Sequence, residues 1–233
     1  MPRPERPIAA AAAPSPAAAI LILTDATMTS ERSSRSSRST RSTRAAASWE
    51  RTHGRLTGAA TDLFRRYGVQ STSIDDIVRA ANLTKPTLYR HFSSKENLVV
   101  ACLHEEGRQT RRALAETVEL APCEPSQRLR AIGAYFAATF ADSPSRGLFA
   151  LNLAVEYAQP GTPIHQAIHE EIERFHDRLA LLIAPDASAS IQSVARKLAL
   201  VVFGASAACQ AVGATACEHL VESVEGLIVE FQA

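Results

Sequence analysis

The segment from Ser71 to Leu98 constrains the fold more than any other part of this 233-residue chain. Apolar residues at helical spacing predict one short helix from Ile74 and a second from Lys85 to His91. Only residues 81–84 (Ala-Asn-Leu-Thr) separate them, and asparagine adopts a positive φ more readily than most other non-glycine residues. Two short helices joined by so tight a turn predict a helix-turn-helix.

Capping residues mark the ends of these helices. Ser73 and Asp76 have the spacing of a reciprocal N-terminal cap for the first helix. Thr84 is placed to cap the second helix, whose first turn tolerates Pro86 because the missing N–H has no intrahelical acceptor there. Ser93 is predicted to cap the long helix that follows. Upstream, an amphipathic helix should end at Gly68, and its apolar face comprises Leu56, Ala59, Ala60, Leu63, Phe64 and Tyr67.

The second helix of the pair leaves a polar and basic face once its apolar residues are turned inward. Such side chains at a helix start reach base edges in a DNA major groove, and their neighbours reach phosphates. A generic helical hairpin with a solvated face is the alternative. The predicted DNA-binding residues are Thr72, Ser73, Thr84, Lys85, Pro86, Thr87, Tyr89, Arg90, His91 and Lys95.

The net charge also differs along the chain, and the part that contains the helix-turn-helix is basic. Residues 1–54 carry a net charge of +4 and residues 55–100 of +3, whereas residues 101–233 carry −6. A basic front half is expected where one end of a protein faces phosphates, although a chance gradient explains the charges equally well.

The run from Arg55 to Leu98 resembles the DNA-binding domain of tetracycline-repressor (TetR) regulators. Asn82 stands where that family usually has glycine, and Thr84 where serine is commoner. The resemblance implies a three-helix DNA-binding domain, an all-helical C-terminal domain with an inducer pocket, and a homodimer. The matching residues are Ala59-Ala60, Leu63-Phe64, Gly68, Thr72-Ser73-Ile74, Asp76-Ile77, Ala80-Ala81, Leu83-Thr84-Lys85, Thr87-Leu88-Tyr89, His91-Phe92, Ser94-Lys95-Glu96 and Leu98.

Helical periodicity continues to the end of the chain, with no alternating strand pattern of useful length, so the predicted fold class is all-α. The expected organisation is a disordered Arg/Ser-rich extension over residues 1–47, the helix-turn-helix domain over 48–95, and a regulatory and dimerisation domain over 96–233. Breaks rich in proline and glycine place further helices at about 126–141, 145–157, 163–184, 188–213 and 216–231. Arg146-Gly147, Asn152, Glu156 and Pro163 resemble one group of TetR-type regulatory domains more loosely.

An effector pocket is expected among the helices between about residues 100 and 180. Aromatic side chains dominate the candidates, for which ordinary core packing is the alternative. Asn152 and Glu156 lie one turn apart in an apolar stretch, where an interhelical hydrogen bond explains them as well as a ligand does. The predicted ligand-binding residues are Tyr135, Phe136, Phe140, Phe149, Asn152, Glu156, Tyr157, His169 and Phe175, with His165 as a further candidate.

His165 and His169 share a helix face with Glu173, so a metal-dependent enzyme is a rival hypothesis. A zinc protease motif would place glutamate directly after the first histidine, and Gln166 stands there instead. No third ligand is placed by the sequence, so neither metal nor cofactor is expected.

The last two predicted helices are expected to form the dimer interface, although closure of the monomer core explains the same pattern. Small residues there are Gly204, Ala205, Ala208 and Ala211, and the apolar stripe comprises Leu198, Val201, Val202, Leu220, Val224, Leu227 and Ile228.

Other features favour a cytoplasmic protein. The four cysteines contain no Cys-x-x-Cys pair and are expected to be reduced core residues. The apolar stretch from Ala17 to Leu23 is too short to span a bilayer, and no signal peptide is predicted. Met28 is an alternative first residue. The arginine repeat at residues 32–44 is either a solvated tail or an arm that contacts DNA.

The sequence therefore predicts a ligand-responsive transcriptional regulator, most simply a repressor that binds a palindromic operator as a dimer and is released by a small apolar molecule. A metal-dependent enzyme and a non-specific DNA-binding protein are the alternatives.

Overall fold

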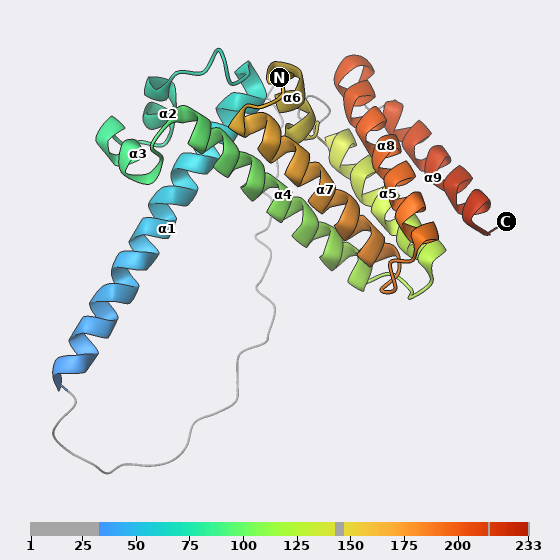
Figure 1. Cartoon of the computed structure of the whole chain (residues 1–233), viewed down its shortest axis with the longest axis horizontal. Helices are drawn as coiled ribbons and strands as arrows, with labels where there is room; N and C mark the ends of the chain where they lie inside the picture. Colours follow the sequence, from blue (N-terminus) through green and yellow to red (C-terminus); the bar gives the residue numbers. More distant parts are fainter. Residues whose placement is uncertain (1–32, 143–146, 214, 233) are drawn as a thin grey trace, which may run out of the picture. The chain divides into compact units, whose positions relative to one another are not determined.

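The computed structural model describes residues 33–142, 147–213 and 215–232. These residues form helices without strands (Figure 1), which confirms the predicted all-α class. The chain divides into two compact units, Met1–Arg44 and Ala45–Ala233, and the packing described below lies within the second. The helices are α1 (Ser33–Tyr67), α2 (Ile74–Ala80), α3 (Lys85–His91), α4 (Lys95–Glu119), α5 (Pro125–Asp142), α6 (Phe149–Glu156), α7 (Pro163–Ile183), α8 (Ala189–Val212) and α9 (Ala216–Gln232).

Helix α1 begins earlier than the sequence predicts. Residues 33–47, for which the composition predicts disorder, are helical. Extending an existing helix adds one hydrogen bond per residue without a new nucleation step, and the three alanines at 45–47 have the highest helix propensity. Growth backward from the amphipathic part of α1 accounts for the difference. The expectations for the apolar stretch at 17–23 and for Met28 lie outside the described residues.

A first group of buried residues, the N-terminal core, joins the helix-turn-helix to later helices. Leu56 and Phe64 of α1 pack with Ile77 of α2 and Leu88 of α3. The same cluster also contains Leu98, Val99, Cys102 and Leu103 of α4, Phe149 and Leu153 of α6, and Ile164, Ala167 and Ile168 of α7. Packing is therefore continuous across the predicted domain boundary at residue 95.

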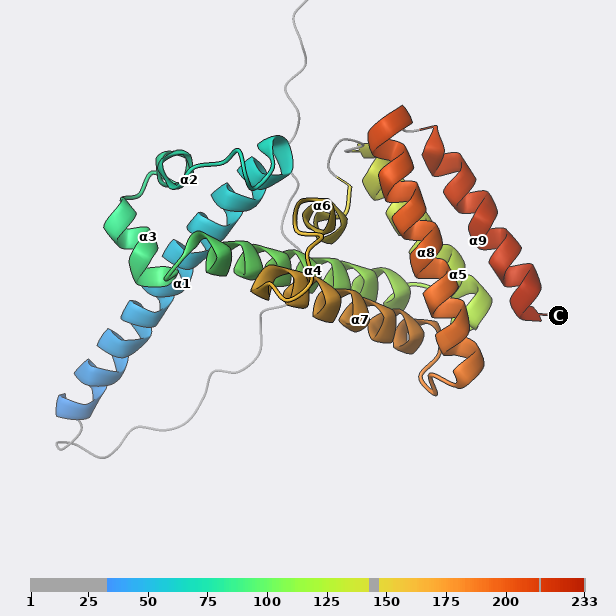
Figure 2. The ribbon, with the colours of Figure 1, turned by 45° about the horizontal axis from the view of Figure 1, so that its top comes forward.

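A second group, the C-terminal core, lies among α4, α5, α7, α8 and α9. Helices α4 and α7 run side by side, and α8 and α9 form a neighbouring pair (Figures 1 and 2). Helix α8 is long and apolar enough to cross a bilayer. Nine of its residues are buried against other helices of the chain, so it is a core helix here.

Much of the apolar stripe predicted for the dimer interface lies inside the monomer. Leu198, Val202, Ala205, Leu220, Val224 and Ile228 are all buried in the C-terminal core. Helical spacing identifies a face that avoids water, but it does not distinguish a partner helix of the same chain from one of a second chain. Of the small residues, Gly204 and Ala211 remain exposed and Ala208 is half-buried.

Candidate DNA-binding surface and effector cavity

The helix-turn-helix has the predicted local structure. Ser73 caps α2, and its hydroxyl accepts a hydrogen bond from the Asp76 N–H while the Asp76 carboxylate accepts one from the Ser73 N–H. The Ser73 hydroxyl also donates to the Asp76 carboxylate at 2.5 Å, and this hydrogen bond, followed by that from the Ser73 N–H and by the charge of Arg79, lowers the pKa of Asp76. The reciprocal cap fixes where the first helix of the pair begins.

The turn between α2 and α3 is held from α1. Asn82 has a φ of +49°, as the turn requires. Nη2 of Arg55 donates to the carbonyl oxygens of Ala81 at 2.6 Å and of Asn82 at 3.2 Å, which gives acceptors at the end of α2 a charged donor. The role of Arg55 is missing from the predicted site because no local pattern pairs it with residues 26 positions away.

Helix α3 buries one side and exposes the other. Leu88 is fully buried, whereas Tyr89 is 52% exposed and Lys85, Pro86 and Arg90 are also exposed. Thr84 caps the helix, and its hydroxyl accepts from the Thr87 N–H.

Lys85 faces outward but is paired. Its Nζ lies 2.9 Å from Oδ1 of Asp75 on α2, and this hydrogen bond raises the pKa of Lys85. With the lysine and the aspartate both more than half exposed, the pair is readily exchanged for another partner.

The structure gives four of the predicted DNA-binding residues internal roles. Thr72 is buried and its hydroxyl donates to the Gly68 carbonyl, while Ser73 caps α2. Nζ of Lys95 donates to the Val69 carbonyl at 2.6 Å, and burial lowers the pKa of Lys95. All three residues stabilise the segment between α1 and α3.

His91 is the fourth residue with an internal contact. Its ring stacks on Trp49 of α1 with the centroids 3.7 Å apart. Burial, and then the charges of His53 and Arg90, lower the pKa of His91 and favour the neutral imidazole. This ring therefore joins α3 to α1.

The predicted cap of α4 is wrong by one residue. Ser94, in extended conformation, caps the helix and accepts from the Asn97 N–H at 3.1 Å. The Ser93 hydroxyl instead lies against the Asn97 side-chain amide. Two adjacent serines offer the same chemistry, and the backbone conformation at Ser94 decides between them.

Glu156, the last residue of α6, joins this helix to the helix-turn-helix. Its carboxylate accepts hydrogen bonds from the Val69 N–H at 2.9 Å and the Gln70 N–H at 3.1 Å, directly after α1. The next residue, Tyr157, accepts from the Gln70 side chain at 3.2 Å. Both were candidates for ligand contact, and the structure places both against the helix-turn-helix instead.

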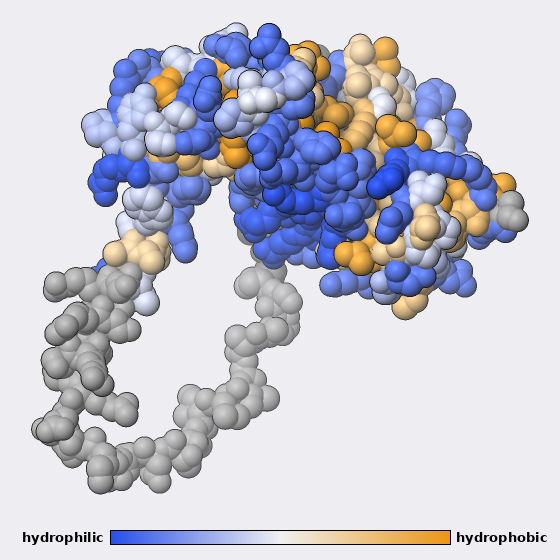
Figure 3. Space-filling view, in the orientation of Figure 1, coloured by the Kyte–Doolittle hydropathy of each residue, from blue (hydrophilic) through white to orange (hydrophobic). Residues whose placement is uncertain are grey.

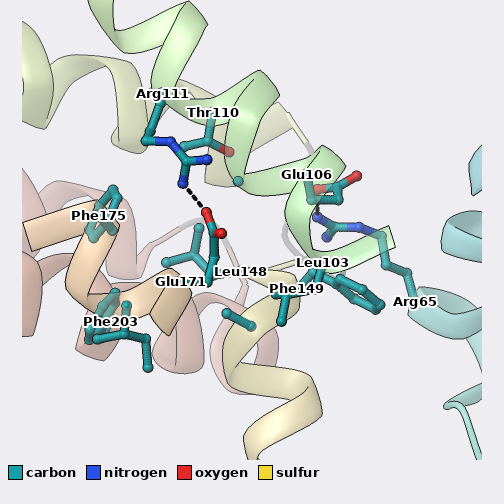
Figure 4. A pocket seen from close by; sticks show the side chains of 13 residues that line it. Arg65, Leu103, Glu106, Thr110, Arg111, Leu148, Phe149, Glu171, Phe175 and Phe203 are labelled. Carbon is teal, nitrogen blue, oxygen red and sulfur yellow. Dashed lines mark hydrogen bonds and ion pairs between the residues drawn. The ribbon is translucent and has the colours of Figure 1, made fainter. Parts of the chain in front are cut away.

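A cavity of about 60 Å³ lies among α1, α4, α6, α7 and α8. Figure 4 shows two ion pairs at its edge, Arg65 with Glu106 and Arg111 with Glu171. Of the predicted ligand-binding residues, Phe149 and Phe175 line it. The remaining lining residues are Leu103, Gly107, Thr110, Leu148, Ala150, Ile172 and Phe203.

Glu171 is the most buried charged residue among those described, with 4% of its surface exposed. Besides Arg111, its carboxylate lies 3.1 Å from Nη1 of Arg174 and 3.3 Å from Nδ1 of His104. A Cβ at Gly107 would lie 1.7 Å from Glu171 Oε1, so only glycine at 107 admits the carboxylate. Burial, then the charges of Arg174 and Arg178, lower the pKa of Arg111.

The other predicted ligand-binding residues lie elsewhere. Phe136 and Phe140 belong to the C-terminal core, and Tyr135 packs against it. Asn152 accepts a hydrogen bond from Gln210 of α8, and His169 is exposed on α7. Core packing describes the three aromatic positions and an interhelical hydrogen bond describes Asn152, which are the alternatives that the sequence left open.

Comparison with known proteins identifies the family. Residues 56–102 match the family model described as bacterial regulatory proteins, tetR family. The chain is 30% identical to a TetR-family transcriptional regulator of known crystal structure from Streptomyces coelicolor, with a TM-score of 0.69 over 78% of this chain and 96% of that one.

The chain belongs to the TetR family of transcriptional regulators.

Two curated relatives are named as HTH-type transcriptional regulators. The chain is 28% identical over 123 residues to the transcriptional repressor DhaR of Mycobacterium sp. (strain GP1), which is 53% of this chain and 59% of DhaR. It is 34% identical over 103 residues to the transcriptional activator FasR of Mycolicibacterium smegmatis, 42% of this chain and 44% of FasR. Both matches cover less than two thirds of those proteins.

Membership of the TetR family decides between the main hypotheses. The chain is a DNA-binding transcriptional regulator and not an enzyme, so the rival hypothesis of a metal-dependent enzyme is wrong. Within the described ranges, no group of three or more His, Cys, Asp or Glu side chains is placed to hold a metal ion. One face of α7 carries His165, His169 and Glu173, and no other described side chain completes a metal site with them.

Proposed function

We propose that two copies of this TetR-family protein bind a palindromic operator and that a small molecule in the cavity releases them. The main support for this proposal is the exposed face of α3. Lys85, Tyr89 and Arg90 lie on that face, and Leu88 is fully buried on the opposite side. A helix held in this way presents polar side chains to a major groove without unfolding its own core. Thr84, Pro86 and Thr87 complete the contact surface, while Thr72, Ser73, His91 and Lys95 hold it in place.

The homodimer forms through α8 and α9 in this proposal. It places one α3 from each copy on the same DNA duplex. Exposed apolar or small residues remain on this pair after the monomer core is filled, among them Leu200, which is 68% exposed, and Val229. Figure 3 shows apolar side chains on the part of the surface formed by α8, and a hydrophilic surface over α4. Close packing of two helix pairs needs such small and apolar side chains.

The cavity chemistry favours a small, uncharged and largely apolar effector. The charged lining residues neutralise one another in pairs, and the rest of the wall is mostly aliphatic or aromatic. A charged effector would have to break one of these partly buried pairs, which is costly because the remaining charge is left without a partner. Thr110, half-buried at the wall, offers the effector a hydroxyl group.

Helix α6 connects the cavity with the operator-binding surface. Phe149 at its start lines the cavity, and Glu156 at its end holds the N–H groups of Val69 and Gln70. An effector releases DNA only if it binds one arrangement of these helices better than the other. Displacement of α6 by the effector would loosen the Glu156 contact and alter the position of α3.

The relatives support repression more often than activation, since DhaR and the Escherichia coli protein ComR are named repressors and FasR an activator. We assign this chain a repressor role in the cytoplasm.

A footprinting experiment on DNA upstream of its own and neighbouring genes tests the proposal. At moderate salt the full chain should protect a palindrome, and Arg90→Ala should weaken binding on every sequence and lower the salt slope by about one. Arg112→Ala, which removes an exposed arginine from α4, is the matched control and should leave binding unchanged. Protection without operator preference, with a steep salt dependence, would support a non-specific DNA-binding protein instead.

A further inference from the structure

Two cysteine thiols meet between α8 and α9. The Sγ atoms of Cys209 and Cys217 lie 3.1 Å apart, and both residues are free cysteines. Both are buried, Cys209 at 1% and Cys217 at 7% exposure. The other two cysteines are separate from this pair, because Cys102 belongs to the N-terminal core and Cys123 is exposed between α4 and α5.

The backbone brings these thiols together by a tight reversal. Cys209 lies in the last turn of α8 and Cys217 in the first turn of α9, with Gly213 between them at a φ of +80°. A disulfide has its sulfur atoms about 2.05 Å apart, so an approach of about 1 Å closes the bond. The side chains already point toward one another, so a small shift of the last turn of α8 toward the start of α9 brings the two sulfur atoms to bonding distance.

We propose that Cys209 and Cys217 are a reversible modification site, closed to a disulfide by a hydroperoxide and reopened by a thiol reductant. One sulfur attacks the peroxide oxygen, which forms a sulfenic acid and releases water when hydrogen peroxide is the oxidant. The second sulfur then attacks the first and displaces hydroxide, which takes up the remaining thiol proton as water. Two thiols and one peroxide give one disulfide and two waters.

The surroundings assign an order to these steps. Burial, and then the neighbouring Cys217, raise the pKa of Cys209 to about 11, so Cys209 stays protonated at neutral pH. Cys217 is the more exposed of the two and meets the oxidant first. Cys209 is then the resolving thiol, and oxidation requires sustained rather than brief exposure to peroxide.

The turn of α8 that holds Cys209 also anchors the start of α6. The Ser206 hydroxyl accepts from the Leu148 N–H at 2.8 Å, and the Gln210 side chain donates to Asn152 at 3.2 Å. A bond from Cys209 to α9 shifts this anchor. Because the far end of α6 holds the helix-turn-helix through Glu156, we expect the disulfide to lower operator affinity. This consequence, unlike the disulfide itself, rests on the proposed function.

Peptide mapping of the oxidised full-length protein tests the site. After prolonged incubation with hydrogen peroxide, the protein should lose two hydrogen atoms in mass, and a single peptide link should join Cys209 to Cys217. A loop this short should raise Tm by about 5 °C. Dithiothreitol should reverse both changes. Cys123→Ser should behave as the wild type, whereas Cys209→Ser and Cys217→Ser should lose the link and the Tm increase.

The outcomes separate the two proposals. Absence of the Cys209–Cys217 link in the wild type, or links through Cys123 only, overturns the proposed modification site. Neither result bears on the proposal that the protein binds an operator. Failure of the reduced protein to bind an operator overturns the regulator proposal alone. If the disulfide forms and the reduced protein binds its operator, oxidation should weaken operator binding by about fivefold. An unchanged affinity would overturn the assigned path through α6.

Discussion

The helix ends of the helix-turn-helix region and the ion pairs of the C-terminal half depend on polar contacts of very different range. Around the N-terminal core, caps join residues three apart, as Ser73 with Asp76 and Ser94 with Asn97. Around the C-terminal core and the cavity, charged pairs join distant residues, as Arg111 with Glu171 at a separation of 60 and Arg130 with Glu225 at 95. Local contacts fix the surface of α3, whereas the long-range pairs are those that the proposed effector would have to rearrange if it moved helices.

Truncation in each core should have the largest effect and tests whether the halves unfold together. Leu88→Ala and Leu198→Ala each remove a fully buried side chain and should each cost about 3 kcal/mol of unfolding free energy. Denaturant unfolding followed by circular dichroism should show one shared transition for both variants, because packing crosses the domain boundary. Two separate transitions would show that the cores are independent.

A methyl group at Gly107 tests the long-range pair. Gly107→Ala places Cβ against the Glu171 carboxylate and should destabilise the protein by about 2 kcal/mol, since overpacking and loss of the pair act together. Gly226→Ala on α9, where a Cβ meets nothing within 4 Å, is the control and should stabilise the helix by about 1 kcal/mol. Equal effects of the two changes in thermal unfolding would contradict the role of Glu171.

Glu156→Gln should affect the link between the halves. The amide retains an acceptor oxygen but loses the charge, which should cost about 1.5 kcal/mol because hydrogen bonds to charged groups are the stronger ones. Operator affinity measured by fluorescence anisotropy should fall as well. Glu116→Gln, an exposed change on α4, should alter neither quantity.

Removal of a local cap should have a smaller effect. Thr84→Ala deletes the hydroxyl that accepts from Thr87 and should cost about 1 kcal/mol, whereas Thr84→Ser should retain most of the stability. Chemical denaturation of the three proteins measures the difference. If Thr84→Ser lowers the unfolding free energy as much as Thr84→Ala does, the effect comes from packing of the threonine methyl group and not from the cap.

Acidification should have the smallest effect. The pKa of His91 is lowered in the folded protein by burial, so the neutral ring is favoured there. Its contribution to stability is complete above the unfolded pKa of about 6.5 and is lost as pH falls through the folded pKa. Tm measured from pH 7.5 to 5.5 should fall, and His91→Gln should reduce that fall. An unchanged slope in the variant would exclude His91.

The range of the contacts also explains how much the sequence could predict. The bounds of α3, its Thr84 cap and the turn at Asn82 depend on neighbours within a few residues, and the sequence predicts them correctly. The internal positions of Lys95 and Glu156 depend on partners 26 and 87 residues away. Only the folded chain identifies those partners.

For the cavity, the sequence predicts its general place and two of its aromatic residues, Phe149 and Phe175. It does not identify Glu171, because a glutamate on a polar helix of mixed charge has no local sign of burial. Gly107 in mid-helix is the one available signal, since glycine there costs stability unless something approaches the backbone closely.

The stack of Trp49 on His91 has a practical consequence. Trp49 is the only tryptophan among the 233 residues, and its ring lies against the last residue of α3. The intrinsic tryptophan emission of the unlabelled protein therefore comes from a chromophore beside α3, the helix that we propose faces the operator. Loosening of α3 by an effector, by oxidation or by acid can be followed in real time without a dye.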